Sequence, residues 1–334
     1  MPYEQRQDQD RALDDYVLAL DLGGSLTKIA RADVSGRLDS THRIPTPALG
    51  DSDGLVRWLA DQISTRLQDP SYGRCRGWGV VVPGIIRADT GHVVAAPNLG
   101  WYDVPLQSRL SELTGVDGVV AHDVRSGGLA EARLGAGQGV ANLLFLPLGT
   151  GIAGAMFVDG RLLDADGFAG EIGHLRVQAA GDLDCACGQV GCLETVASAA
   201  GVARTYQRLS GSSVDVGRFG VAGAVDARQV ADLARAGDAQ ALASFALAAD
   251  ALAEALLVYL TLLGPEVVVM GGGLAAAADL FVPQIERSIA GTVAFQRIPR
   301  LVTAALGPDA GVMGAGLVGW DRARRHPVED RSPT

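Results

Sequence analysis

Hydrophobic and polar positions along the chain follow two periods, one typical of strands and one typical of helices. Short apolar runs at 77–82, 118–122 and 266–270 predict buried strands, with a loop over 83–101 after the first of them. Segments in which apolar residues recur every three or four positions predict helices at 54–67, 105–113, 124–133, 195–209, 227–236, 239–263 and 311–325. Strands that alternate with helices indicate an α/β fold.

Two segments, 17–38 and 143–162, repeat one pattern. Each has an apolar run, a glycine-rich turn, a second strand-like run and a final turn, at Ser35-Gly36 or Asp159-Gly160. Both predict β-hairpins. Two hairpins can resemble each other by chance, but the shared order of features favours duplication. A duplicated α/β unit would place two glycine-rich loops face to face across a cleft.

Composition restricts the class of protein. The chain has 334 residues, 48% hydrophobic and 20% charged, with a net charge of −10, which is typical of a soluble protein long enough for two domains. The sequence has no cluster of basic residues of the kind that would indicate a nucleic-acid-binding surface. The apolar stretch 246–263 carries Asp250 and Glu254, so we expect a buried helix and no membrane span. The polar N-terminus lacks a signal peptide's apolar core, and we expect a cytoplasmic protein.

A metal site is the most specific chemical signal. Three of the four cysteines are spaced as Cys185-x-Cys187-x4-Cys192, and His174 precedes them. One histidine and three cysteines form a complete tetrahedral zinc set, which predicts a structural Zn²⁺. The alternative is a disulfide or buried small residues, which fits a cysteine-poor intracellular chain less well. The flanking carboxylates of Glu171 and Glu194 indicate a polar small-molecule site.

Three glycine-rich turns follow predicted strands. Glycines let backbone N–H groups approach phosphate oxygens, and a hydroxyl adds a further donor. Asp21 at the end of the first strand could hold a metal-bound water. Each turn alone is weak evidence, but three at strand ends in a duplicated fold predict a nucleotide site. The candidate residues are Asp21, Gly23, Gly24, Ser25, Gly149, Thr150, Gly151, Gly271 and Gly272.

Asp123 follows the strand 118–122 and opens a helix. Aspartate is favoured there as an N-cap. A carboxylate in this place can also accept the proton of a substrate hydroxyl during phosphoryl transfer. We therefore consider Asp123 a candidate general base.

The motifs resemble, in the same order, those of the ROK family of bacterial sugar kinases and regulators. They are DLGGSLTK, VVPG, APNLGW, the strand–Asp–helix at Asp123, LGTGIAGA, GFAGEIGH, CACGQVGCLE and VVVMGGGL, and they cover roughly residues 17–320. The glucokinase branch is the most similar. The resemblance implies an actin/hexokinase-like fold, a duplicated pair of ribonuclease-H-like α/β domains with an interdomain cleft. We expect domains at 1–122 plus 311–334 and at 123–310, the larger one carrying the zinc loop.

The resemblance also implies residue roles. Asp123 matches the catalytic base, and His174, Cys185, Cys187 and Cys192 match the zinc ligands. Sugar contacts are implied for Gly84, Asn98, Glu171, His174 and Glu194. Zinc would fix the loop that carries several of these contacts.

The family pattern around the base, Asn-Asp-Ala-Asn, is His122-Asp123-Val124-Arg125 in this chain. His122 replaces an asparagine that contacts a sugar hydroxyl, so it is either a neutral variation or a sign of a changed substrate, and we include it among the substrate-binding candidates. Arg125 could lower the pKa of Asp123 or hold an anion, but we expect it on a solvated face.

The resulting expectation is a kinase that uses ATP and Mg²⁺ to phosphorylate a hexose primary hydroxyl. Alternatives are a kinase for an amino sugar, an N-acetylhexosamine or a cyclitol, and a non-catalytic sugar-sensing regulator. Regulators of this family carry an extra N-terminal DNA-binding domain, for which we expect no room here. The donor could also be polyphosphate. We expect a homodimer or a homotetramer, without a nucleic-acid or membrane partner.

Overall fold

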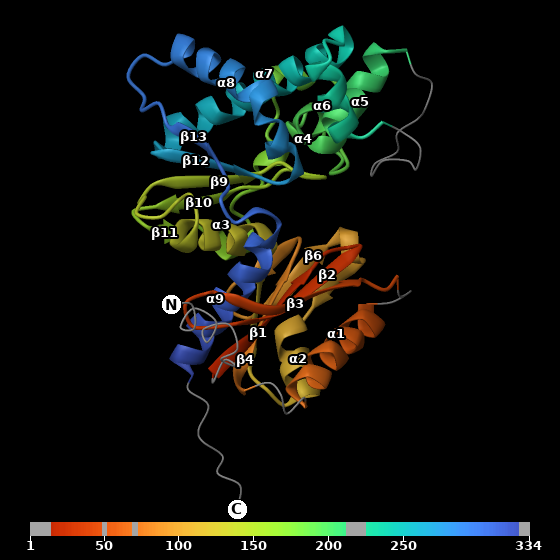
Figure 1. Cartoon of the computed structure of the whole chain (residues 1–334), viewed down its shortest axis with the longest axis vertical. Coiled ribbons are helices and arrows are strands. Elements are labelled where there is room, and N and C mark those ends of the chain that lie inside the picture. Colours follow the sequence, from red (N-terminus) through yellow and green to blue (C-terminus); the bar gives the residue numbers. More distant parts are fainter. Residues whose placement is uncertain (1–14, 49–51, 69–72, 212–224, 327–334) are drawn as a thin grey trace, which may run out of the picture. The chain divides into compact units, whose positions relative to one another are not determined.

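The structure is a computed structural model and describes residues 15–48, 52–68, 73–211 and 225–326. Its contacts divide the chain into two compact units (Figure 1). The first unit contains the chain up to Ala130, residues 164–168, and the chain from Asp309 onward. The second unit contains residues 131–163 and 169–308.

The first unit is built on a five-stranded sheet in the order β3-β2-β1-β4-β8. β1 pairs antiparallel with β2, and β2 antiparallel with β3, whereas β4 runs parallel to both β1 and β8. The predicted hairpin over 17–38 is therefore present and continues into a third strand. The strands are β1 (Asp15–Leu22), β2 (Leu26–Ala32), β3 (Leu38–Pro45), β4 (Arg74–Val82) and β8 (Gly118–His122).

Helices cover both faces of this sheet, and alternation along β1 decides which face each side chain joins. Leu18 and Leu20 share a core with α1 (Ser52–Leu67) and α2 (Leu106–Thr114). Ala19 packs on the other face, with α9 (Ala310–Arg325). α9 comes very close to β4, because a Cβ atom on Gly79 would lie 2.0 Å from the Ala315 carbonyl oxygen.

The segment 83–101, expected to be a loop, forms a small antiparallel sheet in the first unit. It consists of β5 (Ile85–Arg87), β6 (His92–Ala96), the 3₁₀-helix η1 (Pro97–Leu99) and β7 (Trp101–Val104). Prolines, glycines and short strands hide the period of two in this stretch. The sheet buries Ile86, Val93 and Trp101 in the same core as α1 and α2.

The second unit repeats the strand order of the first, as β11-β10-β9-β12-β13. The predicted hairpin over 143–162 lies at β9 and β10, and β12 runs parallel to both β9 and β13. The equal order of the two sheets supports duplication. The strands are β9 (Leu143–Pro147), β10 (Ala155–Val158), β11 (Arg161–Leu162), β12 (Val267–Gly271) and β13 (Arg300–Thr303).

One face of this second sheet is covered by helices. Leu144 and Leu146 of β9 share a core with Phe245 of α7 and Phe281 of α8. The helices are α4 (Glu194–Ala197), α5 (Ala199–Leu209), α6 (Ala227–Arg235), α7 (Ala239–Leu263) and α8 (Ala278–Thr292). Among the described residues, α7 is the one helix long and apolar enough to span a membrane by length and composition, and 56% of its most apolar window is buried within the protein.

Three features differ from expectation. The helix expected over 195–209 is broken at Ser198, which caps α5 through the Gly201 N–H. Helix α8 was not predicted, because Pro283 interrupts its pattern. The boundary expected after residue 122 falls too early. Helix α3 (Asp123–Leu134) begins in the first unit, where Gly314 of α9 lies directly against the Ser126 backbone.

Candidate active site

The β1–β2 turn of the first unit carries the candidate residues from Asp21 to Ser25. The Asp21 carboxylate lies 3.6 Å from Lys28 Nζ and against the first turn of α9, since a Cβ atom on Gly311 would be 2.6 Å from Asp21 Oδ2. Burial raises the pKa of Asp21 to about 6, and the charges of Asp123 and Asp309 also raise it, whereas Lys28 lowers it. An acidic group in a tight, partly charged surrounding of this kind is typical of functional sites.

Asp123 stands at the start of α3, and its side chain is 32% exposed. Its Oδ1 accepts a 2.7 Å hydrogen bond from the Val124 N–H. Burial raises the pKa of Asp123, while this hydrogen bond and the charge of Arg125 lower it to a smaller extent. The side chain is thus partly exposed and its carboxylate is more basic than that of an ordinary aspartate, as a general base requires.

His122 is buried, with its Nδ1 accepting a 3.2 Å hydrogen bond from the Arg125 N–H. Because Nδ1 is an acceptor, Nε2 carries the ring hydrogen. Burial, followed by the charge of Arg125, lowers the pKa of His122 to about 3. His122 is therefore neutral near pH 7 and can donate one hydrogen bond.

Arg125 does not lie on a solvated face, so that expectation was wrong. Its side chain is 6% exposed, its Nε lies 3.3 Å from Asp164 Oδ1, and its Nη2 donates to the Ile86 carbonyl. The helical period alone could not predict this, because the partner Asp164 comes from a segment that the chain inserts into the first unit much later.

Two further sugar-contact candidates lie in the small sheet. Asn98 is exposed in η1, and the turn glycine Gly24 lies beside it, since a Cβ atom there would be 3.4 Å from the Asn98 carbonyl oxygen. Gly84 has a φ of +112°, and a Cβ atom would lie 2.2 Å from the Ala95 carbonyl oxygen. Packing against β6 therefore already requires glycine at position 84.

In the second unit, Glu194 joins two of the predicted motifs. Its Oε2 lies 3.4 Å from the Ile152 N–H, next to the turn Gly149–Gly151. Its Oε1 lies 3.4 Å from Cys185 Sγ. Gly272, with a φ of +76°, packs against the backbone of Leu148 at the start of the same turn, and Gly271 packs on the Phe145 ring. The second unit thus brings its two glycine-rich segments to one place.

The four predicted metal ligands come together. Their ligand atoms all lie within 4.8 Å of one another. The Cys187 and Cys192 sulfurs are 3.7 Å apart, and Cys185 Sγ is 3.7 Å from His174 Nδ1. A tetrahedral ion with metal–sulfur bonds of about 2.3 Å would place its sulfurs about 3.8 Å apart. The donor set and its spacing therefore fit a tetrahedral metal ion.

The other ring nitrogen of His174 faces a carboxylate. His174 Nε2 lies 3.9 Å from Glu171 Oε2, and Glu171 is exposed. Nδ1 can thus bind a metal while Nε2 contacts a ligand, so the two roles predicted for His174 are compatible. Tyr259 of α7 is near enough for Glu171 to affect it: burial, followed by the charge of Glu171, raises the pKa of Tyr259 to about 12.

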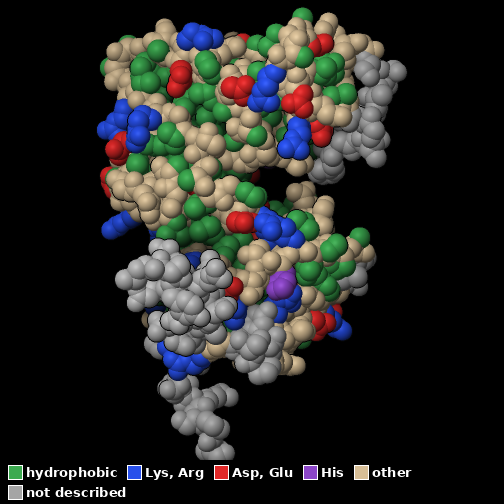
Figure 2. All heavy atoms as spheres, viewed as in Figure 1, with side chains coloured by type: hydrophobic (Ala, Val, Ile, Leu, Met, Phe, Trp, Pro, Cys, Tyr) green, Lys and Arg blue, Asp and Glu red, His purple; other side chains and the backbone are tan. Residues whose placement is uncertain are grey.

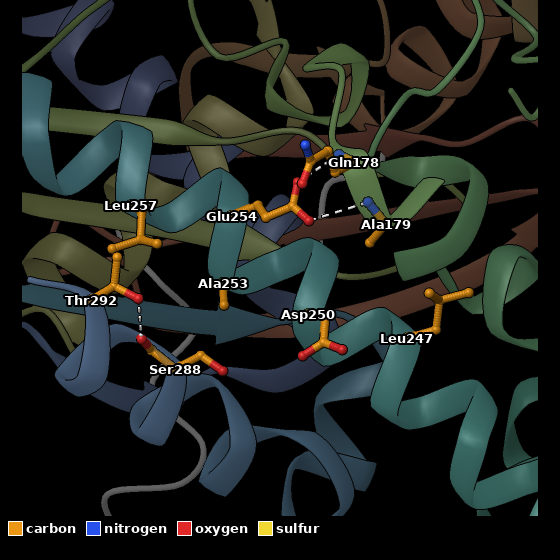
Figure 3. A pocket seen from close by; sticks show the side chains of 9 residues that line it. All are labelled: Gln178, Ala179, Leu247, Asp250, Ala253, Glu254, Leu257, Ser288 and Thr292. Atoms are coloured by element: carbon orange, nitrogen blue, oxygen red, sulfur yellow. Dashed lines mark hydrogen bonds between the residues drawn. The ribbon is translucent and has the colours of Figure 1, made fainter. Parts of the chain in front are cut away.

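The second unit also has a cavity of about 490 Å³ that contains none of the predicted residues. Figure 3 shows it between α7, α8 and the 3₁₀-helix η4 (Gln178–Ala180). Two acidic residues line it, Asp250 and Glu254, and Glu254 accepts hydrogen bonds from the Gln178 and Ala179 N–H groups. Its charge is therefore used to cap η4. On the face that Figure 2 shows, acidic and basic side chains are intermixed with apolar ones.

Sequence reasoning missed Lys28 and Thr46. Lys28 is the only lysine of the chain. It lies directly opposite Asp21 in the β1–β2 register. The predicted hairpin over 17–38 was sufficient to place Lys28 opposite Asp21. Thr46 contacts the turn from the end of β3, and no local pattern marks it.

Comparison with known proteins agrees with this arrangement. The ROK family model matches residues 17–319. A glucokinase of Halalkalibacterium halodurans is 35% identical over 318 residues, covering 91% of this chain and 94% of that protein. N-acetylgalactosamine kinase AgaK of Shewanella sp. strain ANA-3 is 30% identical, covering 90% and 95%.

A solved structure is similar over the same length. The crystal structure of a ROK family glucokinase from Streptomyces griseus in complex with glucose and AMPPNP has a TM-score of 0.76 and 26% identity, covering 93% of this chain and 99% of that one. The fold is therefore the actin/hexokinase-like α/β fold expected from the motifs. Because the family match spans nearly all of the described residues, and both the duplicated sheets and the His–Cys₃ cluster agree with it, the chain belongs to the ROK family.

Proposed function

We propose that this chain is an ATP-dependent sugar kinase that phosphorylates the primary hydroxyl of a hexose to give a sugar 6-phosphate. The observation that carries the proposal is the accessible Asp123 carboxylate with a raised pKa, in the same unit as the glycine-rich β1–β2 turn. The glucokinase relative and the glucose complex of the similar structure support the reaction and the substrate class. The Asp123 carboxylate argues against a purely sensory protein.

Asp123 acts as the general base. The sugar hydroxyl oxygen forms a bond to the γ-phosphorus, the bond from that phosphorus to the β–γ bridging oxygen breaks, and ADP leaves. The hydroxyl proton passes to a carboxylate oxygen of Asp123. Burial favours this transfer because it raises the proton affinity of the carboxylate. Positioning and charge stabilisation supply most of the remaining rate enhancement.

The glycine-rich turns bind the nucleotide. Backbone N–H groups of Gly24 and Ser25 would contact phosphate oxygens, and the Ser25 hydroxyl would add a donor. Gly23 closes the turn, because its N–H donates to the Leu26 carbonyl at 3.0 Å. Mg²⁺, when bound, neutralises phosphate charge, and Asp21 would hold one of its waters. In the second unit, the nucleotide-binding residues are Gly149, Thr150, Gly151, Gly271 and Gly272.

Sugar hydroxyls require several polar partners that are held in place. We assign this role in the first unit to Asn98 and His122, with the Gly84 backbone nearby, and in the second unit to Glu171, His174 and Glu194. The link between Glu194 and the Gly149–Gly151 turn supports the assignment, because it connects a sugar contact to a nucleotide segment.

Zinc is the ion we propose for the His–Cys₃ cluster, with His174, Cys185, Cys187 and Cys192 as ligands. Four protein ligands leave no open coordination position, so the ion is structural. When bound, it fixes the loop that carries Glu171 and Glu194. The 3.7 Å spacings within the cluster support this assignment.

An amino-sugar or N-acetylhexosamine acceptor is the second candidate. His122 favours it, because a neutral histidine whose Nδ1 is occupied can donate but not accept, unlike the amide it replaces. The N-acetylgalactosamine kinase relative is in keeping with this candidate. A cyclitol acceptor is possible on the same chemistry.

A coupled kinase assay tests the proposal directly. Purified protein is assayed with ATP or polyphosphate as donor and with glucose, mannose, glucosamine, N-acetylhexosamines and inositol as acceptors. We expect ATP-dependent ADP release with at least one hexose. No turnover with any hexose would contradict the proposal. Light scattering of the same protein tests the homodimer or homotetramer that we propose.

A further inference from the structure

The glycine-rich β1–β2 turn is held in place by a residue outside its motif. Thr46, directly after β3, donates a 2.7 Å hydrogen bond from Oγ1 to the Gly23 carbonyl. Its N–H donates to the Ser25 carbonyl at 3.1 Å. One residue therefore fixes two of the turn's carbonyl groups.

Peptide geometry gives these contacts a consequence. In a trans peptide, the C=O of one residue and the N–H of the next point in opposite directions, and the described chain has no cis peptide bond. Because Thr46 holds the Gly23 carbonyl, the Gly24 N–H points to the opposite side of the turn. The Leu26 N–H does the same, because the Ser25 carbonyl is also held. Thr46 thus fixes the direction of the Gly24 and Leu26 N–H groups, whereas the Gly23 N–H is already bonded to the Leu26 carbonyl.

A second threonine supports the first. Thr27 Oγ1 lies 2.8 Å from Thr46 Oγ1, and Thr27 is fully buried in β2. The single hydroxyl hydrogen of Thr46 is used on Gly23, so Thr27 must be the donor in this pair. The result is a chain of hydrogen bonds from Thr27 through Thr46 to Gly23. In a partly buried chain of this kind, the bonds polarise one another and each becomes stronger.

We propose that Thr46 is a positioning residue for the phosphoryl donor, which orients the N–H groups of the β1–β2 turn toward the nucleotide phosphates before they bind. The inference rests on the proposed function, in which this turn binds nucleotide. Preorganised N–H donors bind anions without first losing conformational freedom. The effect of Thr46 is therefore confined to ligands that carry phosphate.

Three variants test this role. Thr46→Val keeps the shape and removes the hydroxyl, Thr46→Ser keeps the hydroxyl, and Thr41→Val makes the same change on β3, in a side chain with no described hydrogen bond to the turn. Calorimetry measures the Kd of ATP, ADP and adenosine for each protein, and steady-state kinetics measure both KM values. These measurements separate phosphate binding from base binding and from sugar binding.

We expect Thr46→Val to raise the Kd of ATP and ADP by about tenfold, because a Gly23 carbonyl without its partner lets the turn rotate. The Kd of adenosine and the KM of the sugar should stay within about twofold, a difference too small to reflect a lost hydrogen bond. Thr46→Ser should restore ATP binding, and Thr41→Val should match the parent. If Thr46→Val does not fold, Thr27→Val should show a weaker effect of the same kind.

Two results would overturn the inference. One is unchanged ATP binding in Thr46→Val. The other is an equal loss for ATP, adenosine and sugar together with a lower Tm, which would indicate a purely structural role. The proposed function is tested separately. If the parent protein binds ATP in the way that depends on Thr46 but phosphorylates no sugar, the role of Thr46 is supported and the kinase activity is contradicted.

Discussion

His122 and Asp123 are neighbours in the chain, yet burial acts on their charge states in one consistent way. It lowers the pKa of His122 to about 3 and raises the pKa of Asp123, so each is driven toward its neutral form. The histidine is kept as a neutral hydrogen-bond donor. The aspartate remains an acid–base group because its side chain is still partly exposed.

We expect His122→Asn to change acceptor specificity. The amide provides a donor and an acceptor where His122 offers only a donor, so hydroxyl and N-acetyl ligands are paired differently. The kcat/KM ratio between glucose and its amino or epimeric analogues should shift by at least about tenfold, or 1.4 kcal/mol. The ratio is measured at saturating ATP and pH 7.5, with the exposed His42→Asn as control. An unchanged ratio in an enzyme that prefers glucose would make His122 a neutral variation.

Asp21 should make the first unit less stable as the pH rises. Its pKa is about 6 in the folded chain, against 3.8 for an ordinary aspartate, so the folded state binds the proton more tightly. The destabilisation is absent below pH 4, grows between pH 4 and 6, and reaches on the order of 3 kcal/mol above pH 6.

Asp21→Asn removes this effect, so its unfolding free energy should exceed that of the parent at pH 7.5 and approach it near pH 4. Urea unfolding followed by tryptophan fluorescence isolates the first unit, because all four tryptophans, Trp58, Trp78, Trp101 and Trp320, belong to it. A difference between the two proteins that does not vary with pH would show that Asp21 titrates normally.

At the scale of elements, the zinc loop can be tested without reference to catalysis. Cys187→Ser should bind less than one zinc per chain and lower the Tm, because loss of a ligand weakens metal binding and folding together. Metal analysis after chelator washing and circular dichroism provide the two measurements. Cys75→Ser is the matched control, since Cys75 lies in the first unit and outside the cluster.

The destabilisation caused by Cys187→Ser should also be confined mainly to the second unit. Unfolding detected by tryptophan fluorescence should change less in Cys187→Ser than unfolding detected by circular dichroism, because the loop belongs to the second unit. Metal-free parent protein with full stability would mean that the cluster has no structural ion.

Elements with strong local patterns could be predicted from the sequence, and those without them could not. Helix α7 was expected over the residues that it occupies, since its caps Asp238 and Gly264 flank a long apolar period. Helix α8 was missed because of Pro283, and the sheet of β5 to β7 was taken for a loop. These elements depend on contacts between distant segments, such as Gly167 against the Ile86 backbone.

At the scale of the whole molecule, the duplication could be predicted from the sequence, whereas the division into two units could be predicted only in part. Two similar hairpins predicted two sheets, and both sheets have the same strand order. The insertion of residues 164–168 into the first unit could not be foreseen, because its contacts, such as the Arg125–Asp164 pair, join segments far apart in the sequence. The same gap explains why Arg125 was misplaced while the cysteine cluster, whose ligands are close in sequence, was assembled as predicted.

The central claim is that Asp123 is the base of a sugar kinase, and the most direct test is the turnover of Asp123→Asn. The measurement is kcat with the best hexose at saturating Mg-ATP, with Asp89→Asn, an exposed aspartate of the same unit, as control. We predict a loss of roughly 10²- to 10⁴-fold in kcat with sugar binding retained and the control unchanged. An Asp123→Asn enzyme that phosphorylates the sugar at close to the parent rate would reduce Asp123 to a helix-capping residue and contradict the account.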